Sequence, residues 1–349
     1  MIDVAIVGAA GYAGVELTRL LVGHPMMRAV HLTSAAHADT RVGDLYPALA
    51  SHVDVAYVEP DADAIADAAS IAFLAVPHTA AMALVPRLLE RGVTVIDASA
   101  DFRLSDPALY ERWYGVAHSC PELLAEAVYG LPELDRGALP GARLVACPGC
   151  YPTASILAAF PALAEGVAGG TRVIIGAISG VSGAGKAPGP GVHYCAVTES
   201  VAAYKVAAHR HTPEIAERLS HVTGSPVRVT FSPHLAPLSR GLLATVYLDL
   251  TEDSSSLTTS EAVDLYRSRY ANEPFVTVHA PGVMPSTAEV RGTNRAHIGV
   301  VVDEDAGMLV AVCAIDNLVK GTSGQAIQCA NLVLGLDETA GLDIPGWGV

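Results

Sequence analysis

The feature that most constrains the fold is a glycine-rich turn between a short apolar segment and a helix at the start of the chain. Residues 2–7 predict a buried strand, residues 8–14 carry three glycines, and residues 15–22 repeat apolar side chains at helical spacing. The alternation continues, with strands predicted over residues 29–33, 71–76 and 93–98 and a helix over residues 80–90. This order of elements predicts an α/β fold built on a doubly wound parallel sheet.

The second half of the chain has a different pattern. The 349 residues exceed what one core ordinarily holds, so two domains are expected. A strand over residues 143–146 leads through Pro148 and Gly149 into a helix over residues 151–160. From about residue 171 the chain shows alternating strands, as over residues 227–231 and 242–250, between Gly- and Pro-rich loops. These features predict an α+β domain with an antiparallel sheet.

The end of the chain predicts where the domains divide. An Ala-, Leu- and Val-rich helix is expected over residues 316–336, in a position to pack back on the first domain. We therefore assign residues 1–149 to a Rossmann-type nucleotide-binding domain completed by residues 316–349. Residues 150–315 form the second domain, which we expect to carry catalysis and oligomerisation.

Charge and cysteine usage exclude several classes of function. The 21 basic and 36 acidic side chains give a formal net charge of −15, which repels nucleic acid and anionic membranes. No apolar run reaches the roughly 18 residues of a membrane span, and the chain opens without the basic segment of a secretory signal. Six cysteines scattered through a long chain are typical of a reduced protein. We expect a cytoplasmic protein that binds no nucleic acid, membrane or metal.

The glycine turn predicts a cofactor site. Its spacing is G-x-x-G-x-x-G, and the three glycines are Gly8, Gly11 and Gly14. Tyr12 and Ala13 lie between the last two. Glycines let the backbone approach a pyrophosphate, and the N-terminus of the following helix favours its charge. A tight turn without a ligand is the alternative.

The end of the second predicted strand distinguishes between cofactors. NAD sites often carry an acidic residue there to bind the ribose hydroxyls. Here Thr33 and Ser34 supply hydroxyls, and Arg41 is in reach of a 2′-phosphate, which favours NADP(H). Asp39 nearby weakens this argument.

Cys150 is the candidate nucleophile. It follows Pro148 and Gly149 where a strand turns into a helix, and a helix N-terminus lowers the pKa of a thiol and supplies N–H groups for an oxyanion. Cys120, Cys195, Cys313 and Cys329 are expected to be small buried side chains. Cys147 and Cys150 also form a Cys-x-x-Cys, so a redox pair or a regulatory disulfide is an alternative interpretation.

The proton-transfer partner is expected near His209. His209 and His211 precede Thr212, Pro213 and Glu214, which resemble the start of a helix, so both histidines are predicted to lie on a loop. Loops before helices are common positions for catalytic groups. A solvated His-Arg-His loop is the alternative.

Taken together, these motifs resemble those of one family over essentially the whole chain: the N-acetyl-γ-glutamyl-phosphate reductases, within the semialdehyde dehydrogenase superfamily. The matching segments are residues 8–14, 99–103, 148–153, 179–185, 209–214 and 314–321. The resemblance implies an NADPH-dependent reductive dephosphorylation of N-acetyl-γ-glutamyl phosphate to N-acetylglutamate 5-semialdehyde, in arginine biosynthesis. It also implies Cys150 as the nucleophile that forms a thioester and His209 as the general acid/base.

The resemblance extends to further site residues and to assembly. We assign Arg103, Ser182, Lys186 and His211 to the acyl-phosphate substrate, because a phosphate needs cations and hydrogen-bond donors. The cofactor residues are Gly8, Gly11, Tyr12, Ala13, Gly14, Ser34, Arg41, Pro77, Ser179 and Asn317. Gly321 is also expected near the nicotinamide. Relatives are homo-oligomers, so a homodimer or homotetramer is expected.

Three positions depart from the family pattern. Cys147 stands where the family usually has Asn, and Ala35 stands where it often has Arg. Lys186 stands where Arg is frequent, which keeps the charge but loses the bidentate fork for phosphate.

Two other functions remain open. A lysine-pathway reductase of a carrier-protein-linked aminoadipyl phosphate resembles the chain nearly throughout, but its nucleophile motif tends to read Gly-Cys-Asn-Ala, whereas here Tyr151 and Pro152 follow Cys150. Aspartate-semialdehyde dehydrogenases have a different motif there. A non-catalytic NADP-binding regulator is opposed by the intact Cys150 and His209.

Overall fold

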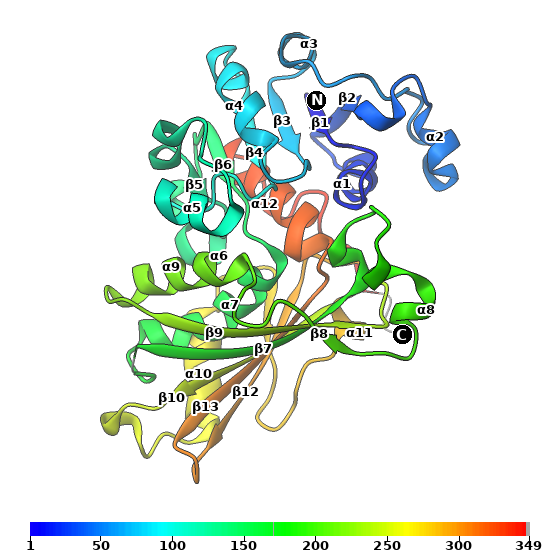
Figure 1. The fold of residues 1–349 in the computed structure, drawn as a ribbon. Coiled ribbons are helices and arrows are strands. Elements are labelled where there is room, and N and C mark those ends of the chain that lie inside the picture. The colour runs from blue at the N-terminus through cyan, green and yellow to red at the C-terminus, as the bar shows by residue number, and fades with distance from the viewer. Residues whose placement is uncertain (170, 347–349) are drawn as a thin grey trace. The chain divides into compact units, whose positions relative to one another are not determined.

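The computed structural model describes residues 1–169 and 171–346, which form two units (Figure 1). The first unit contains Met1–Pro148 and Thr322–Ile344, and the second contains Gly149–Gly321 with Pro345 and Gly346. The chain thus leaves the first unit directly before Cys150 and returns to it directly after Gly321.

The first unit is built on a six-stranded sheet in which every pairing is parallel. The strand order is β2-β1-β3-β4-β6-β5. Because β1 lies between β2 and β3, the chain reverses its winding direction there, and ligands of such sheets bind at the carboxyl ends of those strands. The predicted doubly wound sheet is confirmed. Its strands are β1 (Ile2–Val7), β2 (Met27–Thr33), β3 (Ile71–Leu74), β4 (Thr94–Asp97), β5 (Val128–Tyr129) and β6 (Leu144–Ala146).

All helices of this unit except α12 lie between its strands in sequence. A buried core of aliphatic side chains joins α4 and the sheet. The helices are α1 (Tyr12–Val22), α2 (Val42–Leu45), α3 (Ala62–Ala68), α4 (Ala81–Glu90), α5 (Pro107–Tyr114), α6 (Pro132–Asp135) and α12 (Gly324–Val333). In Figure 1, α12 lies beside β4, where it returns from the second unit.

The helix predicted over residues 316–336 is shorter than expected. It begins as a π-helical turn, η8 (Val319–Ser323), and continues as α12. The buried carboxylate of Asp316 accepts the backbone N–H groups of Leu318 and Val319, at 2.8 and 3.2 Å, so side-chain hydrogen bonds replace helical ones at that end.

The second unit is built on a seven-stranded sheet of mixed pairing, in the order β11-β12-β13-β10-β7-β9-β8. The prediction of an antiparallel sheet is wrong at two pairings: β7 with β9 and β11 with β12 are parallel. The chain between each of these pairs is long enough, and includes a helix, to make the crossover that parallel strands need. The strands are β7 (Arg172–Gly180), β8 (Ala202–Ala203), β9 (Arg228–Ala236), β10 (Leu242–Asp249), β11 (Val276–Val278), β12 (Ala296–Asp303) and β13 (Met308–Ile315).

The longer helices of this unit pack on the sheet and on one another. The helices are α7 (Cys150–Ala164), α8 (Tyr194–Val197), α9 (His211–Thr223), α10 (Thr259–Arg269) and α11 (Thr287–Val290). α7 is the central one: it contacts β10, β13, α9 and α10, and its residues from Tyr151 to Leu163 are buried. It is apolar all round, which is typical of a helix buried on every side.

One face of the seven-stranded sheet carries exposed apolar side chains. Along β7 the residues alternate, with Val173, Ile175 and Ala177 buried while Ile174 and Ile178 are exposed. Tyr247, paired with Ile174 in register, is exposed on β10.

No helix of the described residues is both long and apolar enough to cross a membrane. Short helical turns complete the described chain. The 3₁₀ turns are η1 (Ala35–His37), η2 (Pro47–Leu49), η3 (Pro121–Ala125), η4 (Arg136–Ala138), η5 (Val181–Ala184), η6 (Pro190–Val192) and η7 (Glu252–Ser254).

Candidate active site

The glycine turn lies at the switch point of the first sheet. Gly8 follows β1 with φ +82°, and a Cβ there would lie 2.5 Å from the carbonyl oxygen of Ala75, which follows β3. A Cβ on Gly14 would lie 2.4 Å from the Gly8 carbonyl oxygen. The fold itself therefore requires glycine at both positions.

Gly11 differs from its two neighbours. The nearest atom to a Cβ built there is the Gly8 carbonyl oxygen at 3.5 Å, an ordinary contact. Gly11 is the N-cap of α1, and Tyr12 and Ala13 form the first turn, with Tyr12 exposed. Since packing leaves space for a methyl group, the missing side chain at Gly11 leaves the helix N-terminus bare for an anionic ligand such as a pyrophosphate.

The end of β2 has hydroxyl and cationic groups suited to a ribose 2′-phosphate. Thr33 ends the strand, and Ser34 continues in extended conformation with its N–H donated to the carbonyl oxygen of Val58. Arg41 forms an ion pair with Asp54, and both side chains are exposed. An exposed ion pair of this kind contributes little stability, so a phosphate can displace the carboxylate at small cost. Pro77, the remaining predicted cofactor residue of this unit, is exposed after β3.

Cys150 is the first residue of α7 in the second unit, as its sequence context predicts. Two glycines surround it closely. A Cβ on Gly321 would lie 2.6 Å from the Cys150 Cβ, and one on Gly149 would lie 2.4 Å from Nε2 of His211. The Gly149 N–H donates to the buried carboxylate of Glu214 at 3.0 Å, which fixes the N-cap of the helix. The thiol therefore sits at a helix N-terminus whose backbone is held from two sides.

His209 has the loop position expected from the sequence, but His211 does not, because α9 begins at His211 itself. The His211 N–H donates to Nδ1 of His209 at 3.1 Å, so the proton of a neutral His209 ring lies on Nε2. Burial, with the positive charges of Lys205 and Arg210, lowers the pKa of His209 to about 4. His209 is therefore neutral at pH 7 and can donate a hydrogen bond from Nε2.

Aromatic side chains enclose the His209 ring. The rings of Tyr151, Tyr204 and Phe231 lie with their centroids 5.5, 5.6 and 5.4 Å from it. The Tyr204 hydroxyl donates to that of Tyr151 at 3.1 Å, which in turn donates to the carbonyl oxygen of His234 at 3.2 Å. Burial, joined by the charge of a Cys150 thiolate, raises the pKa of both phenols, that of Tyr204 to about 12. Cys150, His209 and these two phenols thus belong to one site.

A second group of predicted residues is joined by hydrogen bonds. The Asn317 amide donates to Oγ of Ser182 at 2.9 Å, and its Oδ1 accepts the N–H of Gly241 at 2.8 Å. Ser179 is buried, and its hydroxyl donates to the Gly180 carbonyl oxygen at 3.1 Å. Lys186 is exposed on the loop that follows Ser182.

Arg103 and Cys147 lie in the first unit and have structural partners. The buried guanidinium of Arg103 donates to the carbonyl oxygens of Cys147 at 2.8 Å and Ala98 at 2.9 Å. The thiol of Cys147 is buried beside that of Cys329, and this contact together with burial raises its pKa. The neighbour of Cys147 is therefore Cys329, and a thiol so buried is unreactive.

The sequence interpretation missed two residues near Cys150, the buried Glu214 and the half-buried Tyr204. In the sequence, Glu214 was interpreted only as part of a helix start. Its position three residues after His211 could have indicated that its carboxylate belongs to the same site. Tyr204 had no such signal, since it lies outside every motif.

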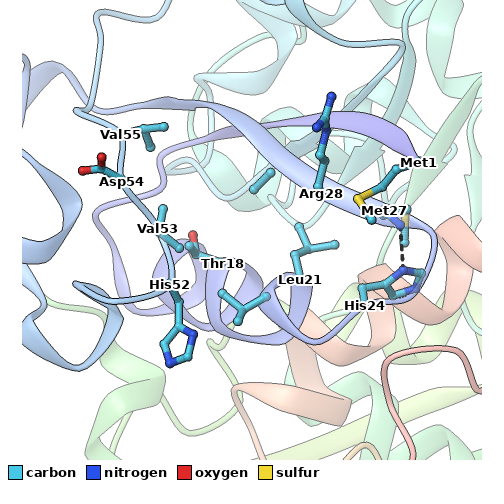
Figure 2. A pocket seen from close by; sticks show the side chains of 12 residues that line it. Met1, Thr18, Leu21, His24, Met27, Arg28, His52, Val53, Asp54 and Val55 are labelled. Atoms are coloured by element: carbon cyan, nitrogen blue, oxygen red, sulfur yellow. Dashed lines mark hydrogen bonds between the residues drawn. The ribbon is translucent and has the colours of Figure 1, made fainter.

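The first unit also contains a hollow of about 230 Å³ (Figure 2). Figure 2 shows Thr18, Leu21, Arg28 and the segment from His52 to Val55 around it, and none of the predicted cofactor residues lines it. His24 at its edge is bonded through one nitrogen to Asn331 and through the other to the Met27 N–H, which indicates a structural role.

Comparisons with known proteins cover nearly the whole chain. Residues 3–142 match the family model "Semialdehyde dehydrogenase, NAD binding domain", and residues 150–317 match "Semialdehyde dehydrogenase, dimerisation domain". The chain is 48% identical to an N-acetyl-gamma-glutamyl-phosphate reductase of Alkalilimnicola ehrlichii, over 99% of both chains. It is 49% identical to one of Halorhodospira halophila, over 98% of both.

Solved structures show the same fold at low sequence identity. Aspartate semialdehyde dehydrogenase II of Vibrio cholerae is 15% identical with a TM-score of 0.73, covering 96% of this chain and 98% of its own. The Candida albicans aspartate semialdehyde dehydrogenase, solved with NADP, is 14% identical with a TM-score of 0.68, covering 95% of this chain and 98% of its own. The full-length relatives are far more similar than these structures. The chain therefore belongs to the N-acetyl-γ-glutamyl-phosphate reductases of the semialdehyde dehydrogenase family.

Proposed function

We propose that this chain reduces N-acetyl-γ-glutamyl phosphate to N-acetylglutamate 5-semialdehyde with NADPH, through a thioester on Cys150. The observation that carries the proposal is a cysteine at the N-terminus of α7 in one site with a neutral, half-buried histidine. The names of the full-length relatives support this substrate.

Cys150 performs the first step. Its thiolate attacks the acyl carbon, the carbon–oxygen bond to the phosphoryl group breaks, and phosphate leaves with the proton that the thiol gave up. The developing oxyanion lies where backbone N–H groups of the α7 N-terminus can stabilise it. Covalent capture divides one difficult reduction into two easier steps.

His209 acts on the second oxyanion. NADPH, when bound, would supply the hydride that reduces the thioester carbonyl carbon. The Nε2–H of His209 then donates a hydrogen bond to the tetrahedral oxygen, a role that suits a ring neutral at pH 7. As the carbonyl re-forms, the carbon–sulfur bond breaks, the aldehyde leaves, and the electron pair returns to sulfur as thiolate. A ring held by the His211 N–H keeps this orientation through the cycle.

The remaining assignments follow the charges that each group must bind. Gly8, Gly11, Gly14, Tyr12 and Ala13 hold the pyrophosphate at the α1 N-terminus. The other cofactor contacts of this proposal are Ser34 and Arg41 at the 2′-phosphate, with Pro77, Ser179 and Asn317.

Substrate phosphate needs hydrogen-bond donors and positive charge. Ser182, Lys186 and His211 supply these in the second unit. Arg103 is the fourth proposed phosphate ligand, and its guanidinium also donates to two backbone carbonyl oxygens of the first unit.

We propose a homodimer, or a homotetramer built from it, through the exposed apolar face of the seven-stranded sheet. The match to a dimerisation domain model over residues 150–317 supports this assembly. The cytoplasm is the proposed compartment, since all six cysteines are thiols and such use suits reducing conditions.

The test follows NADP⁺ reduction in the reverse direction with phosphate and N-acetylglutamate semialdehyde. Wild type should show phosphate-dependent turnover, and Cys150→Ala should show none while still binding NADPH. Aspartate semialdehyde and NAD⁺ serve as controls. Near-normal turnover by Cys150→Ser would refute the thioester, and no turnover by a folded, NADPH-binding wild type would refute the substrate.

A further inference from the structure

Three side chains outside the Cys150 site converge in the second unit. His279 directly follows β11, His297 is the second residue of β12, and Glu289 belongs to α11. Nε2 of His279 lies 3.2 Å from Nδ1 of His297, which lies 3.1 Å from Oε2 of Glu289; the third edge, from Glu289 Oε2 to His279 Nε2, is 3.7 Å. Among the described residues, this is the one group of three such side chains close enough to share an ion.

The triangle has the dimensions of a metal site. Zinc binds histidine nitrogens and carboxylate oxygens at about 2.0–2.1 Å in a tetrahedron, so its ligand atoms stand about 3.3 Å apart. The three observed separations lie around that value. Two histidines and one glutamate are also a ligand set that zinc uses when a fourth position is left to water. We propose that His279, Glu289 and His297 bind a divalent transition-metal ion of the zinc class.

Hydrogen bonding alone cannot make both contacts of His297 Nδ1. Nδ1 of His297 faces both His279 Nε2 and Glu289 Oε2, but one ring nitrogen either donates or accepts. If it donates to the carboxylate, it cannot accept from His279; if it accepts from His279, two lone pairs face each other at the carboxylate. A cation between the three atoms uses all of the lone pairs at once.

The backbone holds the histidines in place before any ion binds. The His279 N–H donates to the Ile298 carbonyl oxygen at 2.8 Å, and His297 pairs with Thr277 in the parallel β11–β12 ladder. Both histidine side chains are mostly buried, with 13% and 16% of their surface exposed. Nδ1 of His279 is buried and has no hydrogen-bond partner. The ring can therefore carry its proton on Nδ1, which leaves the lone pair of Nε2 for a metal ion.

The carboxylate is held by its own helix. Glu289 closes a capping box with Ser286, whose N–H donates to the same Oε2 atom at 3.4 Å. The side chain is 42% exposed, which leaves the fourth position of the ion open to water.

Nearby arginines oppose a cation. Arg267 donates to the His279 carbonyl oxygen, and Arg295 lies two residues before His297. The carboxylate and the chain's net charge of −15 act in the opposite direction.

The site shares no residue with the Cys150 group, so its test does not depend on turnover. An untagged protein carrying Cys150→Ser, freed of metal with a chelator, is titrated with Co²⁺ while visible ligand-field absorption is recorded. The background protein should bind one equivalent with the absorption of a low-symmetry, four- or five-coordinate Co²⁺, and one equivalent of Zn²⁺ should remove it.

Variants identify the ligands. His279→Ala and His297→Ala should weaken Co²⁺ binding at least tenfold, whereas His221→Ala, at an exposed histidine of α9, should bind as the background does. Glu289→Gln keeps an N3 residue suited to the capping box and should weaken binding because it removes the charge. Circular dichroism of the metal-free variants checks their folding, and the single-histidine variants are interpreted only where it matches the background.

Two results would overturn the site. One is the absence of ligand-field absorption from the folded background protein. The other is absorption that survives unchanged in both His279→Ala and His297→Ala. Absence of turnover in the wild-type chain, together with Co²⁺ binding by the Cys150→Ser background, would contradict the proposed reductase without affecting the metal site.

Discussion

Gly11 and Gly14 offer a paired test of the cofactor site, because packing requires glycine at position 14 but leaves space for a methyl group at position 11. In Gly14→Ala the new Cβ would meet the Gly8 carbonyl oxygen at 2.4 Å and the Ala9 Cα at 2.5 Å. Both are backbone atoms, which cannot rotate away, so overpacking should cost about 1–3 kcal/mol of the free energy of unfolding of the first unit. Better helix propensity returns at most about 1 kcal/mol.

Gly11→Ala should leave the fold nearly intact. Its Cβ meets nothing closer than 3.5 Å, and replacing glycine by alanine at an N-cap costs about 0.5–1 kcal/mol. The methyl group instead occupies the space that a pyrophosphate needs at the helix N-terminus. We expect the Kd for NADPH to rise at least tenfold, which corresponds to about 1.4 kcal/mol.

The assays separate the two effects. Thermal unfolding without cofactor measures stability, and NADPH fluorescence titration of the folded fraction measures binding. We expect Gly14→Ala to be the less stable variant and Gly11→Ala to be folded but poor at binding. A folded Gly11→Ala protein that binds NADPH as wild type does would refute the placement of the pyrophosphate there.

Three further changes test the second unit. The folded pKa of His209, about 4, is below its unfolded value of 6.5, so the unfolded chain binds more protons between these pH values. The His209 contribution to the free energy of unfolding should therefore fall by about 3 kcal/mol as pH drops from 6.5 to 4, and His209→Asn should remove that contribution in denaturant titrations across this range. Glu214→Ala should cost about 1–3 kcal/mol by stranding the buried N–H of Gly149, while Glu214→Gln, which keeps an acceptor oxygen, should cost less in the same titrations. Tyr247→Glu places a charge on the exposed apolar face and should shift the oligomer to monomer in light scattering; an unchanged mass would exclude this face as the interface.

Much of the fold follows from local sequence pattern. The strand–turn–helix start and the alternation behind it predict the first sheet, because both periodicities and the glycine turn are local features. Strand pairing is not local. The parallel pairing of β7 with β9 depends on where the chain returns after a long excursion, which no window of residues records. The helix at the end of the chain was predicted, but its late start was not, since the Asp316 carboxylate competes for helical N–H groups only in its folded position.

Part of the candidate site can be predicted from the sequence, because some of its residues lie in local motifs. Cys150, His209 and Glu214 lie in contiguous motifs, so the residue types and their order along the chain are themselves a signal of chemistry. Tyr204 enters the site from a loop with no motif of its own. Its role depends on a hydroxyl contact to Tyr151, which exists only after α7 and that loop have packed.

The proposed metal ligands are an extreme case of the same limit. His279, Glu289 and His297 are separated by 10 and 8 residues, and no short zinc-ligand spacing joins them. The parallel pairing of β11 and β12 makes the triangle: it sets Thr277 opposite His297 and leaves His279 one residue beyond the strand, while α11 in the connection delivers the carboxylate. A parallel pair needs such a connection, whereas a tight hairpin would contain no helix to carry Glu289. The misjudged topology of the second sheet and the unpredicted ligand group therefore have one cause, the crossover between β11 and β12.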